Sequence, residues 1–253
     1  GEYELADLFG LENLLKSVEI TERETQRYYK PRYEHYRTII DYSLKAPYFM
    51  GQLEPLGTVP GNFQAFCRDS YDQAGETFWT VFDLVQKGFY LESNIIYRHL
   101  LEVLIQLKYF YKYPELLTGY LSRSQRVTFT KMFNEFTASK LYTDQYGLLS
   151  SIAHGTVAAA MFRFESTTGP RRTSIGCEFN QEYSSAIITQ LTALLLGYYK
   201  HFEVFFPQNT LNNKDLCLFN EAVEWMELHI EDHKRANPGS FNLYDDMEKI
   251  IYP

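Results

Sequence analysis

The segment from Gly88 to Pro114 constrains the fold more than any other, because it is long, mostly apolar and bounded by residues that interrupt helices. Its sequence is GFYLESNIIYRHLLEVLIQLKYFYKYP. A helix that is apolar on most of its surface belongs in a protein interior. Its polar side chains recur at every fourth position, which places them along one face; they are Asn94, Arg98, Glu102 and Gln106. We therefore predict a buried helix with a single polar stripe.

The two charged residues of this stripe, Arg98 and Glu102, must be paired or used if they lie in a core. Their spacing allows a direct ion pair. The pair then has two interpretations. It fixes the helix in the core as a structural device, or Glu102 orients the Arg98 guanidinium towards an anion such as a phosphate. In the second case Asn94 is a candidate substrate-binding residue.

Helical periodicity extends over most of the chain and predicts an all-α fold. Thr21 and Glu24 have the spacing of a capping box, and prolines and glycines in 46–61 predict a loop. Residues 163–180 alternate loosely around a Gly-Pro pair and predict a β-hairpin or an ordered loop. Besides the Gly88–Pro114 segment, the predicted helices are 2–18, 21–44, 63–87, 123–138, 143–161, 182–206 and 214–234.

The loop at 46–61 is also the best candidate for a domain boundary. We expect residues 1–61 to form an N-terminal helical pair and a linker. Residues 62–253 then form the main helical bundle, for which an apolar content of 45% supplies an ample core.

A second candidate site lies in the predicted helix 143–161. Ser150 precedes His154 by four residues and Ser151 precedes it by three, so the three side chains share a face. A histidine at such a position titrates close to neutral pH and can act as an acid or a base. The alternative is a core histidine that is hydrogen-bonded to a carbonyl group or to Ser150.

Other patterns favour neither a metal nor a nucleotide loop. His229 and His233 have the spacing of metal ligands, but no third ligand follows at a suitable distance in an acidic helix. Arg171 and Arg172 beside a Gly-Pro turn could touch phosphate, but a solvated turn explains them better. The sequence contains no P-loop, no dinucleotide-binding motif and no serine-hydrolase motif. We expect neither a metal nor a cofactor.

The net charge of −8 argues against a general polyanion-binding protein. The charge is uneven, however. Residues 98–140 contain seven Lys or Arg and three acidic residues, a net charge of +4. Residues 203–253 contain ten acidic and four basic residues, a net charge of −6. We expect a local basic surface in the middle of the chain.

Three widely spaced cysteines form no disulfide framework, which is typical of a reducing compartment. No signal peptide is recognisable, and no apolar run is long enough to cross a membrane. These features predict a cytoplasmic protein that does not associate with a membrane.

Three patterns together resemble a known family. The first is a glycine, the second is R-x-x-x-E in an apolar helix that ends in aromatic residues and proline, and the third is S-x-x-H on a later helix. The matching residues are Gly88, Arg98, Glu102, Pro114, Ser151 and His154. This arrangement is similar to a family of uncharacterised bacterial helical proteins, close to the AbiV-like abortive-infection branch of the HEPN superfamily. The resemblance covers about residues 72–156.

The resemblance implies a HEPN-like helical bundle in phage defence or toxin–antitoxin function, acting as a metal-independent endoribonuclease and as a homodimer. It implies RNA or a nucleotide as ligand and a cognate partner protein. HEPN enzymes usually carry arginine and histidine close together on one helix. Here Arg98 and His154 would converge from two helices, with Glu102 as the third catalytic residue and Asn94, Ser150 and Ser151 binding substrate. A non-catalytic interaction or ligand-sensing module is the alternative.

Overall fold

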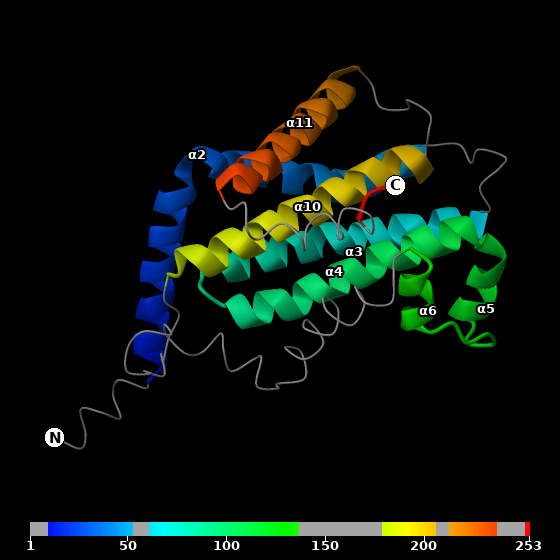
Figure 1. Ribbon diagram of the computed structural model, residues 1–253, viewed down its shortest axis with the longest axis horizontal. Helices are drawn as coiled ribbons and strands as arrows, with labels where there is room; N and C mark the ends of the chain where they lie inside the picture. Colours follow the sequence, from blue (N-terminus) through cyan, green and yellow to red (C-terminus); the bar gives the residue numbers. More distant parts are fainter. Residues whose placement is uncertain (1–9, 53–60, 137–178, 206–212, 237–250) are drawn as a thin grey trace.

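The computed structural model describes residues 10–52, 61–136, 179–205, 213–236 and 251–253, and it is all-α over these residues. Seven α-helices and one short 3-10 helix are present there, and no strand. Figure 1 shows three long helices lying side by side, with a bent helix and a further helix across them. The predicted helical-bundle class is therefore confirmed.

The first helix, α2 (Leu11–Gln52), replaces the predicted pair 2–18 and 21–44 and runs into the predicted loop 46–61. Thr21 does not cap a second helix. It is buried inside α2, and its carbonyl group accepts a hydrogen bond from the Thr25 hydroxyl at 2.8 Å. Figure 1 shows α2 changing direction along its length. The helix includes Pro31, which removes a backbone donor and is a common cause of such bends. The prediction of two helices was wrong because the helix continues through residues 18–21, where Thr21 lies inside the helix and not at its start.

The centre of the fold is formed by α3 (Gly61–Gln86), α4 (Tyr90–Lys112) and α10 (Gln181–Phe205), which contact one another. The chain reverses between α3 and α4, while α4 and α10 run in the same direction (Figure 1). The reversal is made possible by Gly88, whose φ of 80° is unfavourable for residues with a side chain. These boundaries agree closely with the predicted helices 63–87 and 182–206, and with the predicted helix after Gly88.

Two buried tyrosines connect all three central helices. The hydroxyl group of Tyr71 on α3 donates to the carbonyl oxygen of Tyr198 on α10 at 2.6 Å. The hydroxyl group of Tyr198 donates in turn to the carbonyl oxygen of Leu100 on α4 at 2.7 Å. The two rings pack edge to face, with centroids 5.4 Å apart. These two tyrosines thus serve the core with both parts of the side chain, because each ring fills space and each hydroxyl finds an acceptor.

Smaller helices extend from the end of α4. Pro114 begins a 3-10 helix, η1 (Pro114–Leu116), which leads into α5 (Leu117–Leu121) and, after a turn, α6 (Phe129–Asn134). The predicted helix 123–138 was therefore too long. Arg123 has a positive φ of 57°, which is incompatible with a right-handed helix, and Thr128 caps α6 by accepting from the Lys131 backbone N–H.

Helix α11 (Asn213–Ala236) packs against α10 and also contacts α2, in agreement with the predicted helix 214–234. Helix α2 also packs on α3, and Tyr29 from α2 belongs to the same buried cluster as the central helices. The division into residues 1–61 and 62–253 stays a prediction. The predicted hairpin or loop at 163–180 lies outside the described residues, apart from its last two positions.

Candidate functional site

The polar stripe predicted from the sequence lies on α4. Asn94 is buried, and its side-chain amide donates to the Tyr90 carbonyl oxygen at 2.8 Å. Its NH₂ group is thus committed to the backbone one turn earlier. This bond stabilises the first turn of its own helix. Substrate binding by Asn94 stays a prediction.

Arg98 and Glu102 form the ion pair that their spacing predicted. The distance from Arg98 Nε to Glu102 Oε1 is 2.9 Å, and the two side chains are 21% and 23% exposed. The pair thus lies at the edge of the core, not inside it. The Glu102 carboxylate contacts the Nε atom of Arg98. This contact orients the guanidinium group, because the group is planar and one bound nitrogen fixes its plane.

A second arginine–glutamate pair with the same spacing provides a comparison. On α2, Arg23 Nη2 lies 2.8 Å from Glu19 Oε1, but these side chains are 74% and 70% exposed. An exposed pair of this kind contributes little to stability and positions its cation loosely. The burial around Arg98 is the difference between the two pairs. It makes the α4 guanidinium a better candidate for binding an anion.

The other predicted catalytic and substrate-binding residues, His154, Ser150 and Ser151, lie outside the described residues, as do Arg171 and Arg172. The convergence of His154 with Arg98 therefore stays a prediction.

The basic surface expected in 98–140 is reduced by burial and pairing. Lys108 is buried, and the Lys112 ammonium lies 2.6 Å from Glu135 Oε1. The Tyr113 hydroxyl donates to the same carboxylate oxygen at 2.7 Å, and these contacts lower the pKa of Glu135. Lys112 stays exposed but is paired. The other exposed cations on the described part of this stretch lie in or beside the α5–α6 turn; they are Arg123, Arg126 and Lys131.

Sequence analysis missed a buried polar cluster between α4 and α10. Lys108 on α4 donates from Nζ to the Tyr252 carbonyl oxygen at 2.8 Å and lies 4.9 Å from the Phe136 ring centroid. His201 on α10 is 3% exposed and stacks on Phe205, with ring centroids 5.4 Å apart. The sequence did contain a signal for this cluster, namely a lysine and a histidine within apolar helical segments. We gave it less weight than the polar stripe that contains Arg98.

Burial dominates the titration of both groups in this cluster. Desolvation lowers the pKa of Lys108 to about 8. Desolvation and the nearby charge of Lys108 lower the pKa of His201 to about 3, and the main chain of Ile251 acts weakly in the opposite direction. Among the described residues, neither ring nitrogen of His201 has a hydrogen-bond partner of normal geometry. His201 is therefore neutral at physiological pH.

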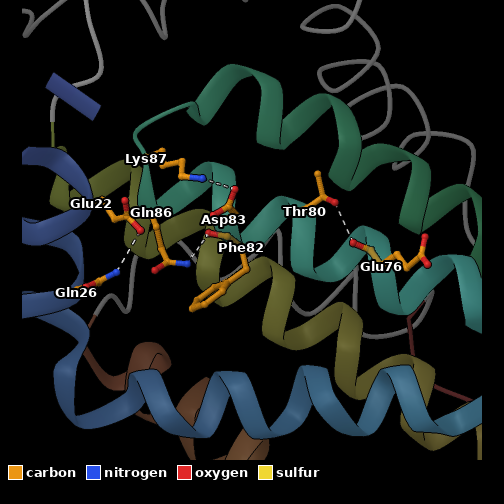
Figure 2. Close-up of polar contacts among 8 residues, drawn as sticks. All are labelled: Glu22, Gln26, Glu76, Thr80, Phe82, Asp83, Gln86 and Lys87. Carbon is orange, nitrogen blue, oxygen red and sulfur yellow. Dashed lines mark hydrogen bonds and ion pairs between the residues drawn. The ribbon is translucent and has the colours of Figure 1, made fainter. Parts of the chain in front are cut away.

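A further polar cluster lies where α3 ends beside α2, and Figure 2 shows it. Lys87 Nζ lies 2.7 Å from Asp83 Oδ2, and this bond is the main reason that the pKa of Lys87 is raised. The charge of Glu22 on α2 also raises the pKa of Lys87, and Glu22 Oε1 accepts a hydrogen bond from the Gln26 side-chain amide. Gln86 beside them is buried and donates weakly to the Phe82 carbonyl oxygen at 3.5 Å. The cluster joins α2 to α3 and brings no catalytic group to Arg98.

The described residues contain no group of three or more potential metal-ligating side chains. His229, one of the two histidines with metal-ligand spacing, is buried and stacks on Trp225. Within the same part of the chain, no helix combines the length and apolar character needed to cross a bilayer.

Comparison of the chain with protein-family models, with curated proteins and with solved structures gives no match. The HEPN-like family assignment therefore stays an expectation based on the sequence motifs.

Proposed function

We propose that the protein is a phage-defence or toxin-type helical protein that acts on RNA as a metal-independent endoribonuclease. The supporting observation is the oriented Arg98 guanidinium, held by Glu102 at the edge of a mostly apolar helix. A cation fixed in a partly dehydrated position is well suited to a phosphate group. The proposal draws its reaction type from the resemblance at Gly88, Arg98, Glu102, Ser151 and His154.

RNA cleavage without a metal requires a base for the 2′-hydroxyl group, an acid for the leaving oxygen, and a cation for the pentacoordinate phosphorus. In this proposal His154 transfers the protons, and Arg98 stabilises the developing negative charge. Glu102 is a positioning residue that acts through Arg98. Asn94, Ser150 and Ser151 contact the phosphate. Two copies in a homodimer would bring two such sets together.

The alternative is a non-catalytic interaction or ligand-sensing module. It is favoured by the way in which the polar stripe is satisfied within α4. The Asn94 amide donates to the Tyr90 carbonyl, and Glu102 neutralises Arg98. In this alternative the stripe fixes the helix at the edge of the core, and a cognate protein or a nucleotide binds elsewhere.

A cleavage assay separates the two functions. Purified protein is incubated with single-stranded RNA in excess EDTA, as wild type and as the variants Arg98→Gln and His154→Ala. We expect EDTA-resistant cleavage by the wild type. Each variant should lose at least about 100-fold in rate, because each removes one element of transition-state stabilisation.

The matched control is Arg23→Gln, which breaks an ion pair of the same spacing on the exposed surface of α2. Its cleavage rate should equal that of the wild type. Circular dichroism establishes that all variants are folded. Absence of cleavage by the folded wild type, or equal rates for Arg98→Gln and Arg23→Gln, would contradict the nuclease proposal and favour the interaction module.

A further inference from the structure

The last three residues of the chain occupy a site between α4 and α10. Ile251 is buried against the position of Gly197 on α10. A Cβ atom at Gly197 would clash with Ile251 Cγ2 and would lie 2.8 Å from the Ile251 carbonyl oxygen and 3.3 Å from Leu104 Cδ2. The missing side chain of Gly197 is therefore the space that Ile251 fills. Figure 1 shows the C-terminus beside α10.

Two lysines contact Tyr252, the next residue. Lys108 of α4 donates to its carbonyl oxygen at 2.8 Å, and the ammonium of Lys200 on α10 lies 4.7 Å from its ring centroid. The first contact recognises a main-chain group and the second an aromatic face. We name Leu104, Lys108, Gly197 and Lys200 the tail site.

Covering the tail site with residues 251–253 carries a cost in desolvation free energy. Lys108 loses most of its hydration there. The buried His201 imidazole next to it has no hydrogen-bond partner of normal geometry among the described residues, and only the Ile251 main chain acts weakly on it. Buried polar groups are normally satisfied, and those that are not lower the stability of the closed arrangement. Departure of the tail would return both groups towards water. The attraction of the tail is thus opposed by a desolvation cost within its own binding site.

We propose that the tail site is a peptide-binding site whose occupant, residues 251–253 of the same chain, is released and rebound without unfolding of the bundle. The site selects a β-branched apolar residue in the Gly197 gap, followed by an aromatic residue whose carbonyl group meets Lys108. Release uncovers Lys108 and His201 between α4 and α10. This inference is independent of the proposed nuclease activity.

Peptide complementation tests the site in the intact 253-residue chain. Ile251→Asp places a charge in the Gly197 gap and should unseat the tail. A fluorescent synthetic peptide with the sequence of residues 248–253 is then added, and anisotropy is measured. We expect saturable binding to the Ile251→Asp protein. Binding should be at least about tenfold weaker in wild type, because its own tail competes. The same peptide carrying the Ile251→Asp change should not bind.

Glycine variants provide a matched control. Gly197→Ala fills the gap, whereas an alanine at Gly61 meets no atom within 4 Å. In the Ile251→Asp background, Gly197→Ala should abolish peptide binding and Gly61→Ala should leave it unchanged. Peptide binding that is insensitive to Gly197→Ala, or no binding by folded Ile251→Asp protein, would overturn the proposal.

A second measurement uses the wild type and does not depend on whether Ile251→Asp folds. An amine-reactive reagent is applied under native conditions, and modification of each lysine is followed by mass spectrometry. In the wild type, Lys108 should react faster than the global unfolding rate allows, and low urea should not change this rate. In the Gly197→Ala variant, modification of Lys108 should be at least about tenfold faster. The exposed Lys30 of α2 reports the intrinsic reagent rate. Labelling of Lys108 only through global unfolding would contradict release. A concentration-dependent dimer that protects Lys108 would support the site with the tail of a second copy bound.

Discussion

At the scale of single residues, the structure separates polar groups that are satisfied from those that are not. Arg98 and Glu102 were predictable, because charged residues four positions apart on an apolar helix favour pairing. His201 was not, because sequence gives no information on whether a buried imidazole finds a partner. The partners of a residue depend on which helices pack against it, and those contacts join residues far apart in the chain.

His201 predicts how stability responds to acid. Its pKa of about 3 in the folded state lies below its ordinary value of 6.5. Unfolded chains therefore bind the proton more readily, so this contribution is complete above pH 6.5 and is lost as the pH falls towards 3. At about pH 4.5 the loss should be roughly 3 kcal/mol. Urea unfolding from pH 7 to pH 4.5 measures it.

The variant His201→Phe isolates this effect, because phenylalanine keeps an aromatic ring against Phe205 without titrating. It should be about 1 kcal/mol more stable than wild type at pH 7, since two unsatisfied buried nitrogens are removed. The difference between the two proteins should widen as the pH falls. A constant difference across the range would show that His201 is not the titrating group.

At the scale of helices, apolar periodicity predicted α3, α4, α10 and α11 within a few residues, because each buries a continuous face. Local signals were less informative. The capping pattern at Thr21 predicted the start of a second helix, and the prolines and glycines of 46–61 predicted a loop, but α2 continues through Thr21 and as far as Gln52. The turn after α5 depends on a positive φ at Arg123, which residue type alone does not indicate.

The hydrogen bond between Tyr198 and Leu100 predicts a measurable stabilisation of the helix packing. Tyr198→Phe removes the hydroxyl group but keeps the buried ring. We expect a loss of about 1 kcal/mol in the free energy of unfolding, which is typical of a buried neutral hydrogen bond. Urea denaturation with an unchanged slope measures this loss.

Tyr111→Phe is the matched control. Tyr111 also donates from its hydroxyl to a backbone carbonyl, that of Val204 at 3.2 Å, but its side chain is exposed. Water replaces that bond when it is removed, so the loss should be smaller than about 0.5 kcal/mol. Equal losses in the two variants would argue that the Tyr198 hydroxyl contributes nothing through burial.

At the scale of the whole molecule, the charge distribution matters more than the net value of −8. Helix α11 belongs to the acidic C-terminal part, whereas the described cations that stay exposed after α4 gather around the α5–α6 turn. If RNA is the ligand, this turn is the described surface with the charge to attract the strand.

Replacing Arg123, Arg126 and Lys131 together by glutamine should weaken RNA binding at low salt. The slope of log K against log salt should become shallower by about 2, because three phosphate contacts on a single strand are removed. Fluorescence anisotropy at several salt concentrations measures the slope. The control replaces Arg23, Arg27 and Lys30, three exposed cations of α2, and should leave it unchanged. Equal effects of the two sets would point to non-specific attraction.

The bonds from Tyr71 to α10 and from Tyr198 to α4 restrict how the bundle can rearrange. Sliding α10 by one turn would break both bonds at once, and each lost acceptor would have to be replaced inside dry packing. Gradual slippage of α10 past its neighbours is therefore disfavoured. Leu100 lies two positions after Arg98, so a shift of the α4 backbone around Arg98 would act directly on the hydrogen bond that ties α4 to α10.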